Sequence, residues 1–140
     1  MKKITTISFI AVLFFTSCGI FKKDNNAIVS KKIVGTWKLE SMDLGQEIPA
    51  EQKALFDAMM EQMKKDFAMT FKNDGTYEIQ KDAKGETEVG KYRIGDEGKT
   101  LITTTKSGKE DKITIESISS SKIAFTILDN GKTMKMVLIK

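Results

Sequence analysis

The side chains that most often carry catalysis or bind metals are scarce in this sequence. It contains no histidine and one cysteine among 140 residues. The absence of histidine excludes Ser-His-Asp and Cys-His catalysis and imidazole metal sites. A single cysteine excludes an internal disulfide, a thiolate zinc site and an iron–sulfur cluster. We therefore expect no metal site and no cofactor.

Carboxylates are the remaining candidates for catalysis, because paired acids perform glycoside hydrolysis. The runs Glu86-Thr87-Glu88 and Asp96-Glu97 are the densest examples, and we expect them on turns and outward strand positions. Asn73-Asp74-Gly75 and Asp129-Asn130-Gly131 lack the further ligands of a calcium loop, so we interpret them as hairpin turns. No catalytic constellation emerges, and we expect a protein that is not an enzyme.

The charge pattern argues against nucleic-acid binding. The 23 basic and 19 acidic residues give a net charge of +4, of which Lys2 and Lys3 supply half. The other basic residues alternate with acids instead of forming a patch. The length suits one globular domain.

The N-terminus has the organisation of a signal peptide. Lys2 and Lys3 precede an apolar run over residues 7–15, and Thr16-Ser17 leads into Cys18. The apolar run is too short to remain as a membrane-spanning helix. We therefore predict a signal peptide over residues 1–17.

The segment Phe15-Thr16-Ser17-Cys18-Gly19 resembles the lipobox of bacterial lipoproteins. The resemblance implies that Cys18 becomes the new N-terminus and carries a lipid that anchors the protein to a membrane. The alternative is an ordinary secreted protein. Because Gly19 stands where some bacteria use aspartate for inner-membrane retention, we expect the cell envelope, at the outer membrane of a Gram-negative bacterium. Residues 18–32 are polar, and we predict a flexible tether there.

The next segments predict a strand and then a helix. Apolar residues alternate from Ile33 to Leu39, with Trp37 on the inner face. Pro49 suits a first helical turn, and the following residues to Asp66 form an amphipathic pattern of about four turns. Its apolar stripe comprises Leu55, Phe56, Met59, Met60, Met63 and Phe67.

The rest of the chain predicts short strands separated by turn signals every eight to twelve residues. Counting the first strand gives eight, and closing such a meander removes both bare edges of the sheet. We therefore predict an all-β fold with one α-helix. It is an eight-stranded antiparallel up-and-down barrel over residues 33–140, with the helix inserted after the first strand. Eight strands enclose side chains or one small ligand.

Ile33-Val34-Gly35-Thr36-Trp37-Lys38-Leu39 resembles the opening strand of the calycins, the superfamily of lipocalins and fatty-acid-binding proteins. Residues 70–77 and 90–94 are similar to later strands of small bacterial lipocalin-like domains. The resemblance covers residues 33–140 and implies a barrel that holds a hydrophobic molecule. The last strand reads Met134-Lys135-Met136-Val137, without the arginine-x-tyrosine pair by which many fatty-acid-binding proteins hold a carboxylate.

Several inward side chains are candidate ligand contacts, although each also suits ordinary packing. Methionines fill irregular cores and also line surfaces that accept varied apolar partners. A tryptophan at a barrel floor packs and needs one fixed acceptor. Thr103 and Thr105 suit either a polar patch in the cavity or a solvated face. The candidate ligand contacts are Trp37, Met59, Met63, Phe71, Tyr77, Tyr92, Phe125, Met134 and Met136.

Two functions remain open from the sequence. The first is a membrane-tethered module that binds a small hydrophobic or amphipathic ligand, with the helix as a lid whose methionines meet Met134, Met136 or Phe125. The second is a protein-interaction or inhibitor module of the cell envelope with a filled barrel. A hollow barrel favours the first function and a packed barrel favours the second.

Overall fold

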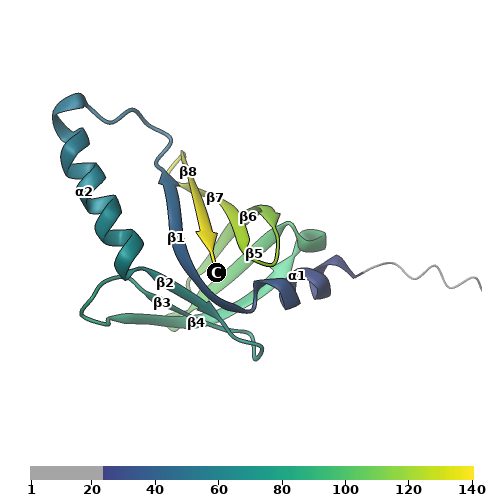
Figure 1. Cartoon of the computed structure of the whole chain (residues 1–140). Coiled ribbons are helices and arrows are strands. Elements are labelled where there is room, and N and C mark those ends of the chain that lie inside the picture. The colour runs from purple at the N-terminus through teal and green to yellow at the C-terminus, as the bar shows by residue number, and fades with distance from the viewer. Residues whose placement is uncertain (1–23) are drawn as a thin grey trace, which may run out of the picture.

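A computed structural model of the chain describes residues 24–140. Consecutive strands pair along the sequence, and the first strand also pairs with the last, so the antiparallel sheet closes into a barrel of eight strands. This confirms the predicted up-and-down barrel. Figure 1 shows one helix at each end of the barrel.

The elements follow one another with short connections. The strands are β1 (Gly35–Asp43), β2 (Ala68–Phe71), β3 (Thr76–Gln80), β4 (Thr87–Gly95), β5 (Thr100–Thr105), β6 (Glu110–Ile118), β7 (Lys122–Asp129) and β8 (Lys132–Ile139). The helices are α1 (Asn25–Ile33) and α2 (Ala50–Asp66), with a short 3-10 turn η1 (Asp96–Gly98) between β4 and β5.

The predicted hairpin turns are confirmed. Gly75 has a φ of 81° between β2 and β3, and Asn130 and Gly131 have φ values of 48° and 77° between β7 and β8. These left-handed conformations favour glycine and asparagine.

Strand β1 closes the barrel by changing partner along its length. Gly35–Lys38 pairs with β2, whereas Lys38–Asp43 pairs with β8. The register with β8 shifts between Leu39 and Ser41, which marks a bulge that bends the strand. Because of this bulge, Met42 faces the interior together with Leu39 and is paired with Met136.

Helix α1 overturns the prediction of a flexible tether over residues 25–32. Asp24 caps the helix, because its side chain accepts a hydrogen bond from the backbone of Ala27 at 3.2 Å. Val29 and Ile33, one turn apart, are buried. Asn26 also accepts a hydrogen bond from the backbone of Gly98 at 2.7 Å. The segment is polar on average, but the free energy gained from these contacts offsets the conformational entropy that is lost when the helix forms.

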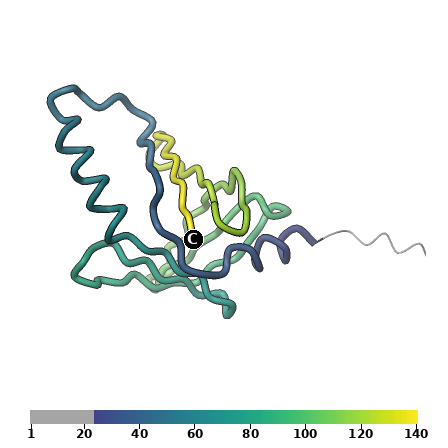
Figure 2. The backbone as a smooth tube through the Cα atoms, in the orientation of Figure 1, coloured from purple at the N-terminus to yellow at the C-terminus, as the bar shows by residue number. Residues whose placement is uncertain are grey.

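Helix α2 has the predicted bounds, but its apolar stripe is only partly covered. Met60 is buried, and Phe56 and Met63 are half-buried against the core. Leu55 and Met59 are 75% and 48% exposed, so their predicted burial is wrong. The reason is geometric: α2 contacts the barrel along β1 and stands away from the wall, as the backbone trace shows (Figure 2). It cannot bury a wide stripe.

Candidate functional site

The barrel end beneath α1 is closed by Trp37. The indole Nε1 donates a hydrogen bond of 2.6 Å to the backbone oxygen of Ile33, and both residues are fully buried. The ammonium of Lys140 lies 4.6 Å from the centre of the indole ring and donates to the backbone oxygens of Lys32 and Val34. Trp37 therefore packs at the floor, which was the alternative to ligand contact.

Three other candidate ligand contacts also lie in or beside this filled half. The side chains of Phe71 and Phe125 are 1% and 2% exposed. Tyr92 meets Phe71 edge to face, with ring centres 4.9 Å apart. Its hydroxyl donates to the backbone oxygen of Lys72 at 2.8 Å. These side chains are held by packing and by that bond.

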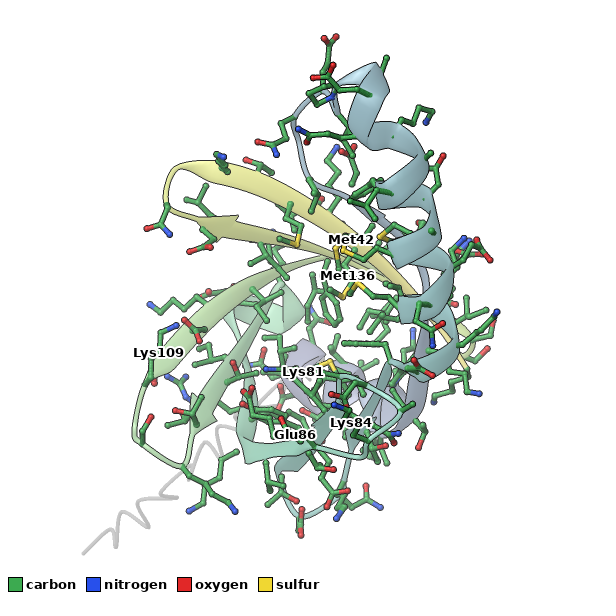
Figure 3. All side chains as sticks on the ribbon, turned by 90° about the vertical axis from the view of Figure 1, so that its left-hand side faces the viewer. Met42, Lys81, Lys84, Glu86, Lys109 and Met136 are labelled. Carbon is green, nitrogen blue, oxygen red and sulfur yellow. The ribbon has the colours of Figure 1, made fainter. Side chains whose placement is uncertain are left out.

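The opposite end of the barrel is open and is apolar on one side. Met42 and Met136 form a cross-strand pair between β1 and β8, and Figure 3 shows them together near α2. Both are half-buried against the core, as is Met63 of α2. Met134 lies one inward position nearer the rim on β8, paired with Ile127. The structure thus places two of the predicted methionines, Met63 and Met136, against the same core, whereas Met134 lines a rim pocket with Leu44 and Asn130.

Met59 lies apart from this group. It lines a shallow groove of about 250 Å³ between α2 and the connection from β1, together with Leu44, Ile48, Leu55 and Phe56. The predicted lid is therefore a flanking helix, and its outer face does not meet the interior.

The other side of the open end is polar. The register pairs Ile79 with Glu88 and Thr103 with Asp111. Because Ile79 and Thr103 face the interior, Glu88 and Asp111 face it as well. The expectation that Glu88 points outward is wrong. The inward alternation of Gly90, Tyr92 and Ile94, extended back by two residues, would have placed it correctly. Asp111 was not singled out, because it follows a turn in a charged stretch.

Tyr77 lies at the centre of this polar side. It is 1% exposed, and its hydroxyl lies 3.4 Å from Oε1 of Glu88. Burial raises the pKa of the Tyr77 phenol, and the charges of Glu88 and Asp111 raise it further. Thr103 of β5 is 6% exposed. Thr103 therefore belongs to a polar patch of the interior and not to a solvated face of the sheet, which were the two alternatives left open by the sequence.

A hollow of about 600 Å³ lies at the rim above this polar side. Its lining includes Glu88 of β4, Thr105 of β5, Lys109 of the β5–β6 turn and Asp111 of β6. The barrel is thus packed at its floor, whereas the inward side chains Met42 and Met136 toward the opposite end are only half-buried. Within residues 24–140, no group of three or more carboxylate, cysteine or histidine side chains is arranged to hold a metal ion.

The chain was compared with known families, curated proteins and solved structures. A family model described as "Domain of unknown function (DUF5004)" matches residues 20–139. No curated protein matches the sequence.

Among solved structures, an uncharacterized protein from Bacteroides eggerthii DSM 20697 is similar at 14% identity and a TM-score of 0.51, over 77% of this chain and 98% of that one. A lipocalin-like protein from Bacteroides uniformis ATCC 8492 is similar at 13% identity and a TM-score of 0.49. The match covers 78% of this chain and 98% of that one. Bovine odorant binding protein, in complex with its natural ligand, is similar at 13% identity and a TM-score of 0.43. The match covers 78% of this chain and 71% of that one. The likeness to the Bacteroides eggerthii protein concerns the fold alone, because only 14% of the residues are identical.

Proposed function

This chain belongs to the DUF5004 family, and we propose that it is a membrane-anchored module that binds a small hydrophobic or amphipathic ligand in the open half of its barrel. The observation that carries the proposal is the incomplete burial of inward apolar side chains at that end. Met42, Ile79, Ile113 and Met136 face the interior but are only half-buried. Thioethers adapt to ligands of different shape, and a concave apolar surface with a few polar groups is the usual form of a ligand site.

Uptake of an uncharged fluorescent dye such as Nile red tests the proposal. Met136→Lys places a charge on the apolar side of the open half, and we expect the dye to bind at least about tenfold more weakly. Met59→Lys is the matched control, because Met59 is 48% exposed on the outer face of α2, and it should leave uptake unchanged.

Circular dichroism and thermal melting report whether both variants keep the strand fold. Loss of uptake in Met59→Lys alone would move the site to the groove beside α2. A wild-type protein that takes up no dye would overturn the proposed function.

The membrane anchor is the second part of the proposal. It rests on the lipobox-like segment that ends at Cys18, which lies outside the described residues. Neither helix within residues 24–140 has the length and apolar character needed to cross a membrane. We propose that the lipid on Cys18 holds the protein at the outer membrane of a Gram-negative cell envelope.

Substitution of the cysteine tests the anchor directly. In Cys18→Ala we expect release from the membrane fraction, or an uncleaved precursor, because the thiol that receives the lipid is missing. Ser17→Ala keeps a small residue at the cleavage site and serves as the control. Unchanged fractionation of correctly cleaved Cys18→Ala protein would contradict the anchor and favour an ordinary secreted protein.

One observation favours a protein-interaction module as the second candidate function. Leu55 and Met59 expose apolar surface beside the groove of about 250 Å³ at α2, while the floor of the barrel is packed. Such a patch suits a protein partner. Dye uptake that is absent in the wild type would favour this function.

A further inference from the structure

A hollow of about 490 Å³ lies at the closed end of the barrel, between α1 and the end of β4. The helix side of its lining includes Ser30, Lys31 and Val34, which are spaced so that they share one face of α1. The other side is formed by the β2–β3 turn and by Tyr92, Arg93 and Ile94 of β4. All of these residues line one and the same hollow, which is separate from the open end of the barrel.

Both walls of this hollow are held in place by hydrogen bonds. On the helix side, Asn26 accepts a hydrogen bond of 2.7 Å from the backbone N–H of Gly98. On the other side, the backbone N–H of Tyr92 donates to the backbone oxygen of Gly75 at 2.7 Å, and the hydroxyl of Tyr92 donates to the backbone oxygen of Lys72 at 2.8 Å. A concave surface that is already fixed loses little entropy when it binds a ligand.

The charged side chains that line the hollow are both positive. They are Lys31 and Arg93, and no carboxylate is among the lining residues within the described part of the chain. Lys31 forms no ion pair with any carboxylate of residues 24–140. The guanidinium of Arg93 lies 3.6 Å from Glu110, and the arginine side chain is 62% exposed. An ion pair this loose contributes little, so an anion in the hollow can compete for the guanidinium.

The aspartates near these walls in the sequence are bound elsewhere. Asp24, Asp74 and Asp96 each accept a hydrogen bond from a donor two to four residues further along the chain, and none of them lines the hollow. The hollow therefore offers two cations, together with the hydroxyl of Ser30 and the side-chain amide of Asn73. Such a set of donors suits the oxygen atoms of a phosphate group.

Helix α1 also follows the proposed lipid anchor closely in the chain. Its N-cap Asp24 comes six residues after Cys18, and six residues extend over about 20 Å at most. The hollow must therefore stay near the membrane surface that holds the lipid. Lys22 and Lys23 precede the helix, and its last turn contains two more lysines and its first turn no acid. Basic residues beside a membrane anchor favour anionic lipids.

We propose that the hollow between α1 and β4 binds the phosphate group of an anionic phospholipid in the membrane that carries the anchor. This inference rests on the membrane anchor of the proposed function. Lys31 and Arg93 donate hydrogen bonds to the phosphate oxygens, while Val34 and Ile94 contact the apolar carbons next to the head group. Because α1 and α2 lie at opposite ends of the barrel (Figure 1), this contact leaves the open end facing away from the membrane.

Sedimentation with vesicles tests the inference. The chain over residues 19–140 contains both helices and all eight strands and lacks the lipid, so it reports the surface contact alone. We expect it to bind vesicles made of equal parts of phosphatidylglycerol and phosphatidylcholine, and to bind phosphatidylcholine alone much more weakly. Lys31→Gln and Arg93→Gln should each weaken binding by about tenfold, because each removes a charged donor to the phosphate. Circular dichroism checks that the variants remain folded.

Lys32→Gln is the matched control. Lys32 lies in the same turn of α1 and is exposed, like Lys31, but it does not line the hollow. Its loss should weaken binding by about threefold or less, because it contributes only to the general attraction, which salt screens. Equal losses in Lys31→Gln and Lys32→Gln would overturn the site, and so would a wild type that does not bind the anionic vesicles.

Inorganic phosphate separates the lipid from a free anion as the ligand. At matched ionic strength, phosphate should release no more protein from the vesicles than chloride does. Release by phosphate alone would assign the hollow to a free phosphate and overturn the lipid as its ligand.

Hydrogen exchange locates the contact on the protein. The amides of α1 and of the β2–β3 turn should gain protection on the anionic vesicles, whereas those of α2 should not. Protection of α2 alone would place the contact at the exposed Leu55 and Met59 and overturn the inference.

A high-salt wash of membranes distinguishes this contact from the lipid anchor. Salt releases Cys18→Ala protein that is held only by Lys31 and Arg93, because it screens their charges, but it does not release a lipid-anchored protein. The anchor can therefore fail while the phosphate contact stands, and the contact can fail while the anchor stands.

Discussion

The two ends of the barrel are supplied by the same strands, yet their inward side chains are covered to different extents. Beneath α1, Trp37 of β1 and Leu138 of β8 are completely buried. Two to five residues along the same strands, Met42 and Met136 are only half-buried. The difference comes from the covering helices, because α1 contacts η1, β4 and β6, whereas the main contact of α2 with the barrel is with β1.

This difference suggests that one end of the barrel mainly stabilises the fold and that the other end mainly binds. The closed end buries Trp37 completely and holds it with a hydrogen bond, so truncation there is expected to cost the most stability. The open end keeps apolar and polar side chains partly accessible, and a site must keep such surface free in order to bind. The two ends are therefore expected to respond differently to equivalent substitutions.

Truncation of the floor should have the largest effect. Trp37→Ala removes a buried ring and its hydrogen bond, and it should lower the free energy of unfolding by about 3–5 kcal/mol. Met136→Ala at the open end should cost about 1–2 kcal/mol, because this side chain is only half-buried. Thr36→Ala, on the outward face of β1, should cost about 0.5 kcal/mol.

Denaturant unfolding of the three variants measures these costs. Equal losses at Trp37 and Thr36 would mean that the faces of β1 are misassigned. Equal losses at Trp37 and Met136 would break the distinction between a filled end and an open end.

A smaller effect tests whether α1 seals the closed end. Gly98 and Gly108 have similar φ values of 89° and 85°. A Cβ at Gly98 would lie 2.9 Å from Cγ2 of Val29 in α1, whereas a Cβ at Gly108 would meet nothing within 4 Å. Alanine at either position carries the strain of a left-handed backbone. Gly98→Ala should therefore cost about 1–3 kcal/mol more than Gly108→Ala.

Hydrogen exchange shows where that cost arises. The amides of α1 should lose protection in Gly98→Ala and keep it in Gly108→Ala. Equal melting temperatures for the two variants would show that α1 docks too loosely to seal the barrel.

The strands could be predicted because each one carries its own signal. Alternation around Trp37 and the turn at Asn130-Gly131 are local patterns that determine face and connection without knowledge of the neighbours. Closure of the sheet into a barrel could be predicted because an open meander would leave the edge strands at both ends of the sheet unpaired. Helix α1 could not be predicted from composition, because its burial depends on Gly98, more than sixty residues away. The N-cap Asp24 and the spacing of Val29 and Ile33 were the local signals present.

The site was less predictable than the fold. Trp37 and Tyr77 were assigned to the interior correctly, but the depth of each side chain depends on the register between strands. The bulge before Ser41 turns Met42 inward, and strict alternation does not anticipate it. Glu88 was taken for a solvated acid because its neighbours are charged. Its inward position follows only when the alternation of β4 is continued to the rim.

The smallest predicted effect contrasts the two tyrosines, one at each end. The pKa values of both phenols are raised, chiefly because burial disfavours the charged form, but the carboxylate of Glu88 acts on Tyr77 and that of Asp74 acts on Tyr92. A raised pKa in the folded state means that this contribution to stability is complete below the unfolded pKa of about 10. It is lost as the pH rises through the folded value, since the unfolded chain ionises first.

Tyrosinate absorbance in single-tyrosine variants resolves the two groups. In Tyr92→Phe, adding Glu88→Gln should lower the pKa of Tyr77, because a repelling charge is removed and the charged acceptor of the phenol's hydrogen bond becomes a neutral amide oxygen. The stability lost above pH about 10 should decrease with it. In Tyr77→Phe, the same Glu88→Gln change should leave the titration of Tyr92 where it was. If Glu88→Gln changes the pKa of neither tyrosine, the charge of Glu88 does not act on the phenol of Tyr77. The side chains on the polar side of the open end would then not be electrostatically coupled.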